Sequence, residues 1–164
     1  MDDTKEHIQY NNTVFPKSNW DLTNIPGAGV LNVQGRISDI GVMINRDGNS
    51  AQSMAEFEVR FLKEENQEQI GNISILASAQ YRVDFSSGIE ESVELADRIF
   101  KDSIEYISGE VAGEVARIVR SGGLKRPISL DPEQIATSLR ELGIDFAMVE
   151  EEPTYSINHT DQDQ

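Results

Sequence analysis

Residues 73–85 read ISILASAQYRVDF, an alternation of apolar with polar or small side chains that only Leu76 interrupts. A period of two over this length predicts one long antiparallel strand with one covered face. From Val93 to Ile118 the apolar residues recur mostly every three or four positions, which predicts a long amphipathic helix. Because a long strand leads directly into a long helix, the chain is predicted to form a sheet layer covered by a helix layer.

Two further strands are predicted ahead of residue 73. Residues 30–44 are rich in β-branched side chains and carry apolar residues on both phases, with a phase change near Ile40 that indicates a bulge. A turn follows at residues 45–50, where Asp47-Gly48 is a strong hairpin signal. The next strand alternates inward Phe57, Val59 and Phe61 with charged residues. With a short edge strand expected within residues 1–29, the sequence predicts an antiparallel meander of about four strands.

The long helix is predicted to begin near residues 90–92 and to end at the pair Gly122-Gly123. Gly109 and Gly113 lie inside it, four residues apart and on one face. They allow another helix to approach closely, or they mark a kink or break near Ser108, and the sequence leaves both interpretations open.

A second, shorter helix is predicted after an extended connection. Asp131 is its expected N-cap, Pro132 occupies the first turn, and Gly143 ends it. The predicted fold class is therefore α+β: an antiparallel meander with a long helix and a short C-terminal helix packed on one side. Residues 1–144 are expected to form a single domain, and residues 145–164 an acidic, disordered tail.

Composition and charge exclude several classes of function. The 164 residues carry a formal net charge of -15, which repels nucleic acids and anionic membranes. There is no cysteine, so disulfides and thiolate metal sites are excluded, and a reducing cytoplasm suits the chain. Neither a signal peptide nor an apolar run long enough for a membrane span is recognised. A cytoplasmic location without membrane insertion is therefore expected.

The sequence contains no recognisable catalytic or metal-binding motif. Its two histidines, His7 and His159, lie in termini that we expect to be mobile, so neither is predicted to act in catalysis or metal binding. Residues 45–56 partly imitate a calcium loop, but Ser50 stands where that loop requires glycine, and strands rather than helices flank it. We therefore expect no catalytic residues, no metal and no cofactor.

Apolar side chains outside the main strand faces point to a binding surface instead. Residues 30–44 are apolar on both phases, and Leu62 and Leu76 point away from the main faces of their strands. If helices cover one side of the sheet, apolar surface remains on the outer face or in a groove under the loop after residue 85. Such surface indicates binding or oligomerisation where it is contiguous, and carries no function where the residues are scattered.

The order of elements resembles that of the bacterial protein-export chaperone family SecB. The most specific part is VRSGG at residues 119–123, followed by PISLDPEQI at residues 127–135, which is similar to the junction before the family's last helix. The resemblance covers residues 30–143. The chain departs from the family at residues 108–110, Ser-Gly-Glu, where the family has an aromatic–proline step. It also lacks, within residues 74–80, the glutamate that docks the export ATPase.

The resemblance implies a homotetramer, a dimer of dimers, that holds unfolded polypeptide clients in apolar grooves without ATP. Gly109 and Gly113 would form the contact between dimers. Protein export is one possible pathway with the export ATPase as a candidate partner, and a SecB-like chaperone of a toxin–antitoxin system is another. The residues that would line the client groove come from the long strand, the following loop and the last helix: Tyr81, Val83, Phe85, Ile89, Ile135, Leu139 and Leu142.

Two other classes of function fit the same order of elements. A small-molecule binder or thioesterase-like enzyme of the hot-dog type wraps a curved sheet around a long helix and usually places an acid on that helix. Glu105, Glu110 and Glu114 are the candidates. The third class is a structural adaptor without a client.

Overall fold

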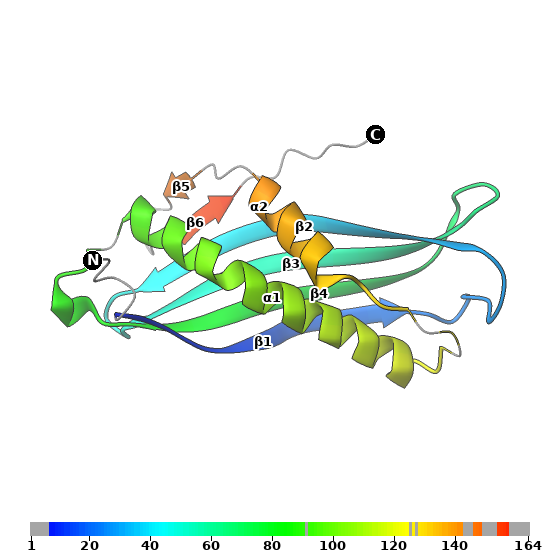
Figure 1. The fold of residues 1–164 in the computed structure, drawn as a ribbon, viewed down its shortest axis with the longest axis horizontal. Helices are drawn as coiled ribbons and strands as arrows, with labels where there is room; N and C mark the ends of the chain where they lie inside the picture. The colour runs from blue at the N-terminus through cyan, green and yellow to red at the C-terminus, as the bar shows by residue number, and fades with distance from the viewer. Residues whose placement is uncertain are drawn as a thin grey trace.

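A long antiparallel sheet forms one layer of the molecule and two helices form the other (Figure 1). The structure is a computed structural model that describes residues 7–90, 92–124, 126, 128–142, 146–148 and 154–157. The sheet has the strand order β1-β4-β3-β2-β6-β5. The bounds are β1 (Ile8–Asp21), β2 (Leu31–Asn45), β3 (Ser50–Lys63), β4 (Gln69–Val83), β5 (Phe146–Met148) and β6 (Thr154–Ile157).

The predicted meander is confirmed, since β2, β3 and β4 are consecutive antiparallel neighbours. The expected bulge also appears, because the register of β2 against β3 shifts between Ile37 and Asp39. The hairpin turn is closed by the side chain of Asn45, whose Oδ1 accepts from the backbone N–H of Gly48 at 3.0 Å. Asn49 has a φ of 49°, a left-handed conformation that asparagine tolerates better than most residues.

The first strand is longer than expected. The sequence predicted a short edge strand, whereas β1 spans 14 residues and pairs with β4 along most of its length. The sequence of β1 shows no regular alternation of apolar residues, because its pairing with β4 shifts register between Tyr10 and Asn12 and again between Val14 and Lys17. Each shift changes the face on which the following residues lie, so a strict alternation is absent from the sequence.

Both predicted helices are present: the long helix begins directly after residues 90–92, and the short helix begins at its expected cap, Asp131. The long helix α1 (Val93–Ser121) is capped by Ser92, whose hydroxyl accepts from the N–H of Leu95 at 3.2 Å. The short helix α2 (Pro132–Glu141) is capped by Asp131, which accepts from the N–H of Glu133 at 3.0 Å. Because α1 is one continuous element, the break near Ser108, one of the two interpretations that the sequence leaves open, does not occur. The predicted stop at Gly143 lies outside the described residues.

Small side chains let α1 lie close to the middle of the sheet. The hydroxyls of Ser53 on β3 and Ser103 on α1 are 2.8 Å apart, and Ser103 donates to the carbonyl oxygen of Phe100 at 2.7 Å. Both serines are completely buried, so these bonds satisfy polar groups that would otherwise destabilise the core. The same face of β3 and β4 contributes Ala51, Ala55, Ala77 and Ala79, all buried.

Part of the predicted tail is described, and it adds to the sheet. Residues 146–148 and 154–157 form β5 and β6, and β6 pairs antiparallel with β2. The other residues of the tail lie outside the described ones, and the domain boundary at residue 144 stays a prediction. None of the described helices has the length and apolar character needed to cross a membrane.

Replacing Gly71 with alanine is expected to lower the free energy of unfolding by about 1–3 kcal/mol. The added Cβ would lie 2.7 Å from the carbonyl oxygen of Asp21 and 2.9 Å from Cδ1 of Ile25. Gly35→Ala is the matched control, because Gly35 also lies in a strand but would have no neighbouring atom within 4 Å. That control should be neutral or stabilising by up to about 1 kcal/mol. Urea unfolding at one protein concentration measures both, and equal stabilities would contradict the packing.

Candidate functional site

The residues predicted to bind a client fall into a buried and a partly buried group. Tyr81, Val83, Phe85 and Leu139 belong to the hydrophobic core of the single chain. The other three are partly buried against that core: Ile89, Ile135 and Leu142. Only this second group is accessible on the single chain, and the client-binding role of all seven stays a prediction.

Tyr81 anchors β4 to α1. Its hydroxyl donates to Oδ2 of Asp102 at 2.7 Å, and its ring meets the edge of Tyr10, with 5.6 Å between the ring centroids. Tyr10 in turn stacks on Tyr106 of α1 at 3.7 Å. Burial, with the hydrogen bond to Asp102 as a smaller cause, raises the pKa of Tyr81 far above the usual value of a tyrosine. The phenol therefore stays protonated and holds β4 to the helix.

The structure does not bring the two halves of the predicted groove together. Tyr81 contacts one flank of α1 through Asp102, whereas α2 contacts the helix through Arg140, whose Nη2 lies 3.5 Å from Oε1 of Glu105. Figure 1 shows α1 running diagonally between α2 and β1. In the single chain, α1 therefore separates the strand residues from those of α2.

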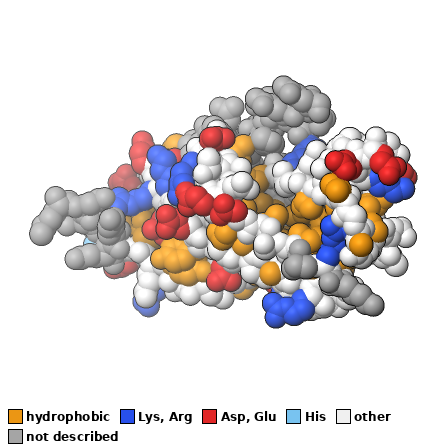
Figure 2. All heavy atoms as spheres, turned by 45° about the vertical axis from the view of Figure 1, so that its right-hand side comes forward, with side chains coloured by type: hydrophobic (Ala, Val, Ile, Leu, Met, Phe, Trp, Pro, Cys, Tyr) orange, Lys and Arg blue, Asp and Glu red, His pale blue; other side chains and the backbone are white. Residues whose placement is uncertain are grey.

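A different set of apolar side chains is exposed where β2 begins. Val30 is 68% exposed and Val33 is 38% exposed. Val33 lies opposite Phe61, which faces the helix layer, so Val33 also lies on that side of the sheet. Figure 2, turned to bring this end of the molecule forward, shows hydrophobic side chains gathered around a hollow. This part of the helix-side face therefore keeps apolar surface open to solvent.

The connection between the helices lies beside the same end of the sheet. Arg126 donates to the carbonyl oxygens of Pro26 at 3.2 Å and Gly29 at 2.8 Å, and Gly29 directly precedes Val30. Leu124, Ile128 and Leu130 of this connection are only partly buried. We call this set the β2-end surface: Val30, Leu31, Val33, Leu124, Ile128 and Leu130. These six residues are not among the predicted client-binding residues, although the apolar residues on both phases of residues 30–44 were a signal.

Gly109 and Gly113 lie on the exposed face of α1. Both are exposed, and a Cβ at either position would have no neighbouring atom within 4 Å. Tyr106, one turn before Gly109, is 43% exposed. The two glycines therefore approach no other helix within the chain, and their role as a contact between dimers stays a prediction.

The three glutamates considered for an enzyme lie on α1 and differ in exposure and in their partners. Glu105 and Glu110 are exposed, and Glu105 pairs with Arg140. Glu114 is mostly buried, but its Oε2 accepts from Nε of Arg117 at 2.9 Å. The hydrogen bond from Arg117 is the main reason that the pKa of Glu114 lies below the usual range. A general base at neutral pH needs the opposite shift.

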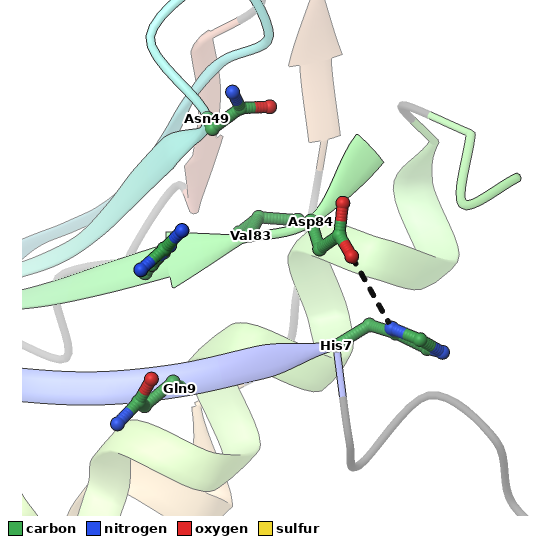
Figure 3. Close-up of a pocket in the computed structure, with 6 residues that line it drawn as sticks. His7, Gln9, Asn49, Val83 and Asp84 are labelled. Atoms are coloured by element: carbon green, nitrogen blue, oxygen red, sulfur yellow. Dashed lines mark ion pairs between the residues drawn. The ribbon is translucent and has the colours of Figure 1, made fainter. Parts of the chain in front are cut away.

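A polar pocket of about 220 Å³ lies at the other end of the sheet (Figure 3). His7, expected in a mobile terminus, is held there, because its carbonyl oxygen accepts from the N–H of Asp84 at 2.9 Å. Its Nδ1 lies 3.7 Å from Oδ2 of Asp84, a carboxyl whose pKa is lowered mainly by the hydroxyl of Ser86. His159 lies outside the described residues. The pocket is lined by His7, Gln9, Asn49, Arg82, Val83 and Asp84.

The residues that line this pocket include no nucleophile beside His7 and Asp84. The pair of His7 and Asp84 has no serine, threonine or lysine in the pocket lining that it could activate as a nucleophile. Within the part of the chain that the structure describes, no three acidic or histidine side chains are grouped to hold a metal ion. The apolar β2-end surface is therefore the best candidate for a functional site.

Comparisons with known proteins support the fold. A scan of known protein families and a search of curated proteins find no match. Among solved structures, the chain is similar to the SecB-like chaperone Rv1957 of Mycobacterium tuberculosis, in complex with a ChAD peptide from the HigA1 antitoxin. The TM-score is 0.62 at 11% identity, covering 77% of this chain and 91% of that one. The chain therefore has a SecB-like fold.

A second solved structure is a protein of unknown function from Streptococcus agalactiae. Its TM-score is 0.38 at 18% identity, covering 76% of this chain and 96% of that one.

Glu114→Gln is expected to lower the free energy of unfolding by less than about 1 kcal/mol at about pH 7, because Arg117 is partly solvated. The pKa of Glu114 is lower in the folded chain than its usual value of 4.5, so its charge stabilises the fold fully above that value. This stabilisation is lost as the pH falls through the lowered folded-state pKa. The difference between variant and wild type should therefore shrink toward about pH 3.

Urea unfolding across this pH range measures that difference. Glu110→Gln, on the exposed face of the same helix, is the control and should show little change. A deficit of Glu114→Gln that stays constant down to the lowest pH would contradict the assigned ion pair.

Proposed function

We propose that this protein is an ATP-independent holdase chaperone that binds non-native polypeptides through exposed apolar surface. The observation that carries the proposal is the β2-end surface on a SecB-like fold, where Val30 and Val33 stay open to solvent and three leucines and Ile128 are only partly buried. Contiguous apolar surface of this kind is costly to expose and usually serves an interaction. Non-native chains offer the complementary apolar segments.

The energetics favour many weak contacts over one tight site. Burying an exposed valine contributes on the order of 1–2 kcal/mol, whereas ordering a flexible client costs several kcal/mol. One β2-end surface therefore binds a short segment weakly. Several copies of the surface on one oligomer would raise the affinity, because each bound segment increases the effective concentration of the next.

Charge supports the same role. A net charge of -15 keeps a protein with exposed apolar surface in solution and attracts basic client segments. Electrostatic attraction acts over a long range, so it speeds the encounter with a basic client. Apolar contacts act over a short range, so they hold the client once it is bound. We expect binding to weaken moderately as salt is added and to persist at high salt. A cytoplasmic location is part of this proposal.

The proposed assembly is a homotetramer, with the α1 face around Gly109 and Gly113 as the contact between dimers. Glycine at both positions leaves room for a helix from another dimer to approach. The exposed ring of Tyr106 adds apolar area next to them.

Two kinds of client pathway fit the proposal. The solved SecB-like chaperone binds a peptide from an antitoxin, which favours a client of a toxin–antitoxin system. Protein export is the other pathway. Docking of the export ATPase is not favoured, since residues 74–80 carry no acidic side chain.

The double variant Val30→Thr/Val33→Thr is expected to bind a reduced, unfolded protein about fivefold to tenfold more weakly, since it replaces exposed methyl groups by hydroxyls of similar size. Val14→Thr is the matched control: Val14 is also a strand valine and also 38% exposed. It pairs with Ser78 on the face away from the helices, so its variant should bind within about twofold of wild type.

Fluorescence anisotropy of the labelled unfolded protein gives the affinity, and light scattering gives the protection from aggregation. Wild-type protein that neither binds the unfolded protein nor delays its aggregation would refute the proposed function. Equal losses in both variants would refute the β2-end surface as the site.

Gly113→Gln is expected to convert a particle of four chains into dimers, because a long side chain would enter the space between the proposed partner helices. Lys101→Gln is the control, since it places the same side chain on another exposed position of α1. Multi-angle light scattering during size-exclusion chromatography measures the mass. A wild-type monomer, or a tetramer unchanged by Gly113→Gln, would contradict this interface.

A further inference from the structure

Only part of the edge of β2 that faces away from β3 is paired with another strand. β6 pairs antiparallel with β2 from Ile40 to Met43. At Leu31–Gly35, among the residues that the structure describes, no strand is paired to β2 on that side. Figure 1 shows β6 beside one end of β2 while the other end continues past it. The peptide groups along Leu31–Gly35 therefore form an edge at which a further strand can pair.

This edge lacks the features by which edge strands usually avoid added strands. Leu31–Gly35 contains neither proline nor lysine, and the register shift of β2 lies beyond it, between Ile37 and Asp39. The opposite edge, β1, carries Pro16 and Lys17 and two register shifts, which together interrupt any regular ladder. The two edges of the sheet therefore differ in their capacity to accept an extended chain.

The β2 edge also borders the apolar β2-end surface. Leu31 and Val33 lie on the helix side of the sheet, whereas Asn32 and Gln34 lie on the other side. A strand added beside them would place every second side chain next to Val33 and the others toward solvent. Main-chain hydrogen bonds would supply affinity without regard to sequence, and alternate apolar side chains would supply selectivity.

We propose that an extended client segment adds to the sheet as an antiparallel strand at Leu31–Gly35, and that β6 is an internal competitor that shortens this edge. The inference rests on the proposed chaperone function. The partner is an extended segment in which apolar and polar residues alternate, with positive charge that complements the net charge of -15. The client would pair with β2 in the same antiparallel way in which β6 pairs with the adjoining part of β2.

The competition has a measurable consequence. If β6 covers its part of the edge about nine-tenths of the time, releasing it raises the apparent affinity for a client that needs the whole edge about tenfold. Tyr155→Pro and Ser156→Pro each remove one backbone N–H from β6. Neighbouring N–H groups of a strand point to opposite sides, so one of the two substitutions removes a donor on the side of β2. Ser156→Ala keeps the N–H and is the control.

The direct test uses the full wild-type chain and a labelled peptide of about ten residues in which valine and lysine alternate. Two further versions carry N-methyl groups on every second residue, one version for each phase. These two differ only in which edge of the peptide can donate hydrogen bonds. The unmodified peptide should bind, one methylated version should bind at least about tenfold more weakly, and the other should bind nearly as well.

The outcomes separate this inference from the proposed function. Three results would overturn strand addition in competition with β6 and leave the holdase proposal intact. They are equal binding of both methylated versions, an unfolded protein that binds while the peptide does not, and unchanged peptide affinity in both proline variants. Failure of the wild-type chain to bind either the peptide or the unfolded protein would overturn both.

Discussion

The architecture depends on the packing of α1 against a face of the sheet that consists of alanine and serine side chains. The hydroxyl oxygens of Ser53 and Ser103 are 2.8 Å apart between the sheet and the helix, and Ala55 and Ala77 are buried on the same face of the sheet. Small side chains bring the helix close, and close packing fixes its diagonal path. That path covers the middle of the sheet, whereas Val30 and Val33 at the beginning of β2 remain exposed. The exposed β2-end surface is a consequence of this geometry.

Periodicity and capping predict most of the fold. The alternation at residues 73–85, the helix stripe after Val93 and the cap at Asp131 all correspond to observed elements. The length of β1 was underestimated because its two register shifts erase the alternation that a regular strand would show. Local patterns therefore identify elements well where the pairing is regular, and poorly where it is not.

The site was harder to predict than the fold. Alternation shows that Tyr81 and Val33 both lie on the helix side of their strands, but it does not show how much of that face the helices cover. Tyr81 lies beneath α1 and is almost completely buried, whereas Val33 lies beyond the helix and is exposed. Exposure depends on the crossing path of α1, which is set by long-range packing. A chaperone-like surface can thus be expected from the sequence, but its position requires the structure.

Amide hydrogen exchange tests the central claim most directly, because it locates the client on the protein. Exchange is measured with and without a permanently unfolded, reduced protein at a concentration at which anisotropy shows binding. The account predicts slower exchange at Val30–Gly35 in the presence of the unfolded protein, with little change along the β1 edge. Bound client with unchanged exchange at Val30–Gly35 would contradict the account.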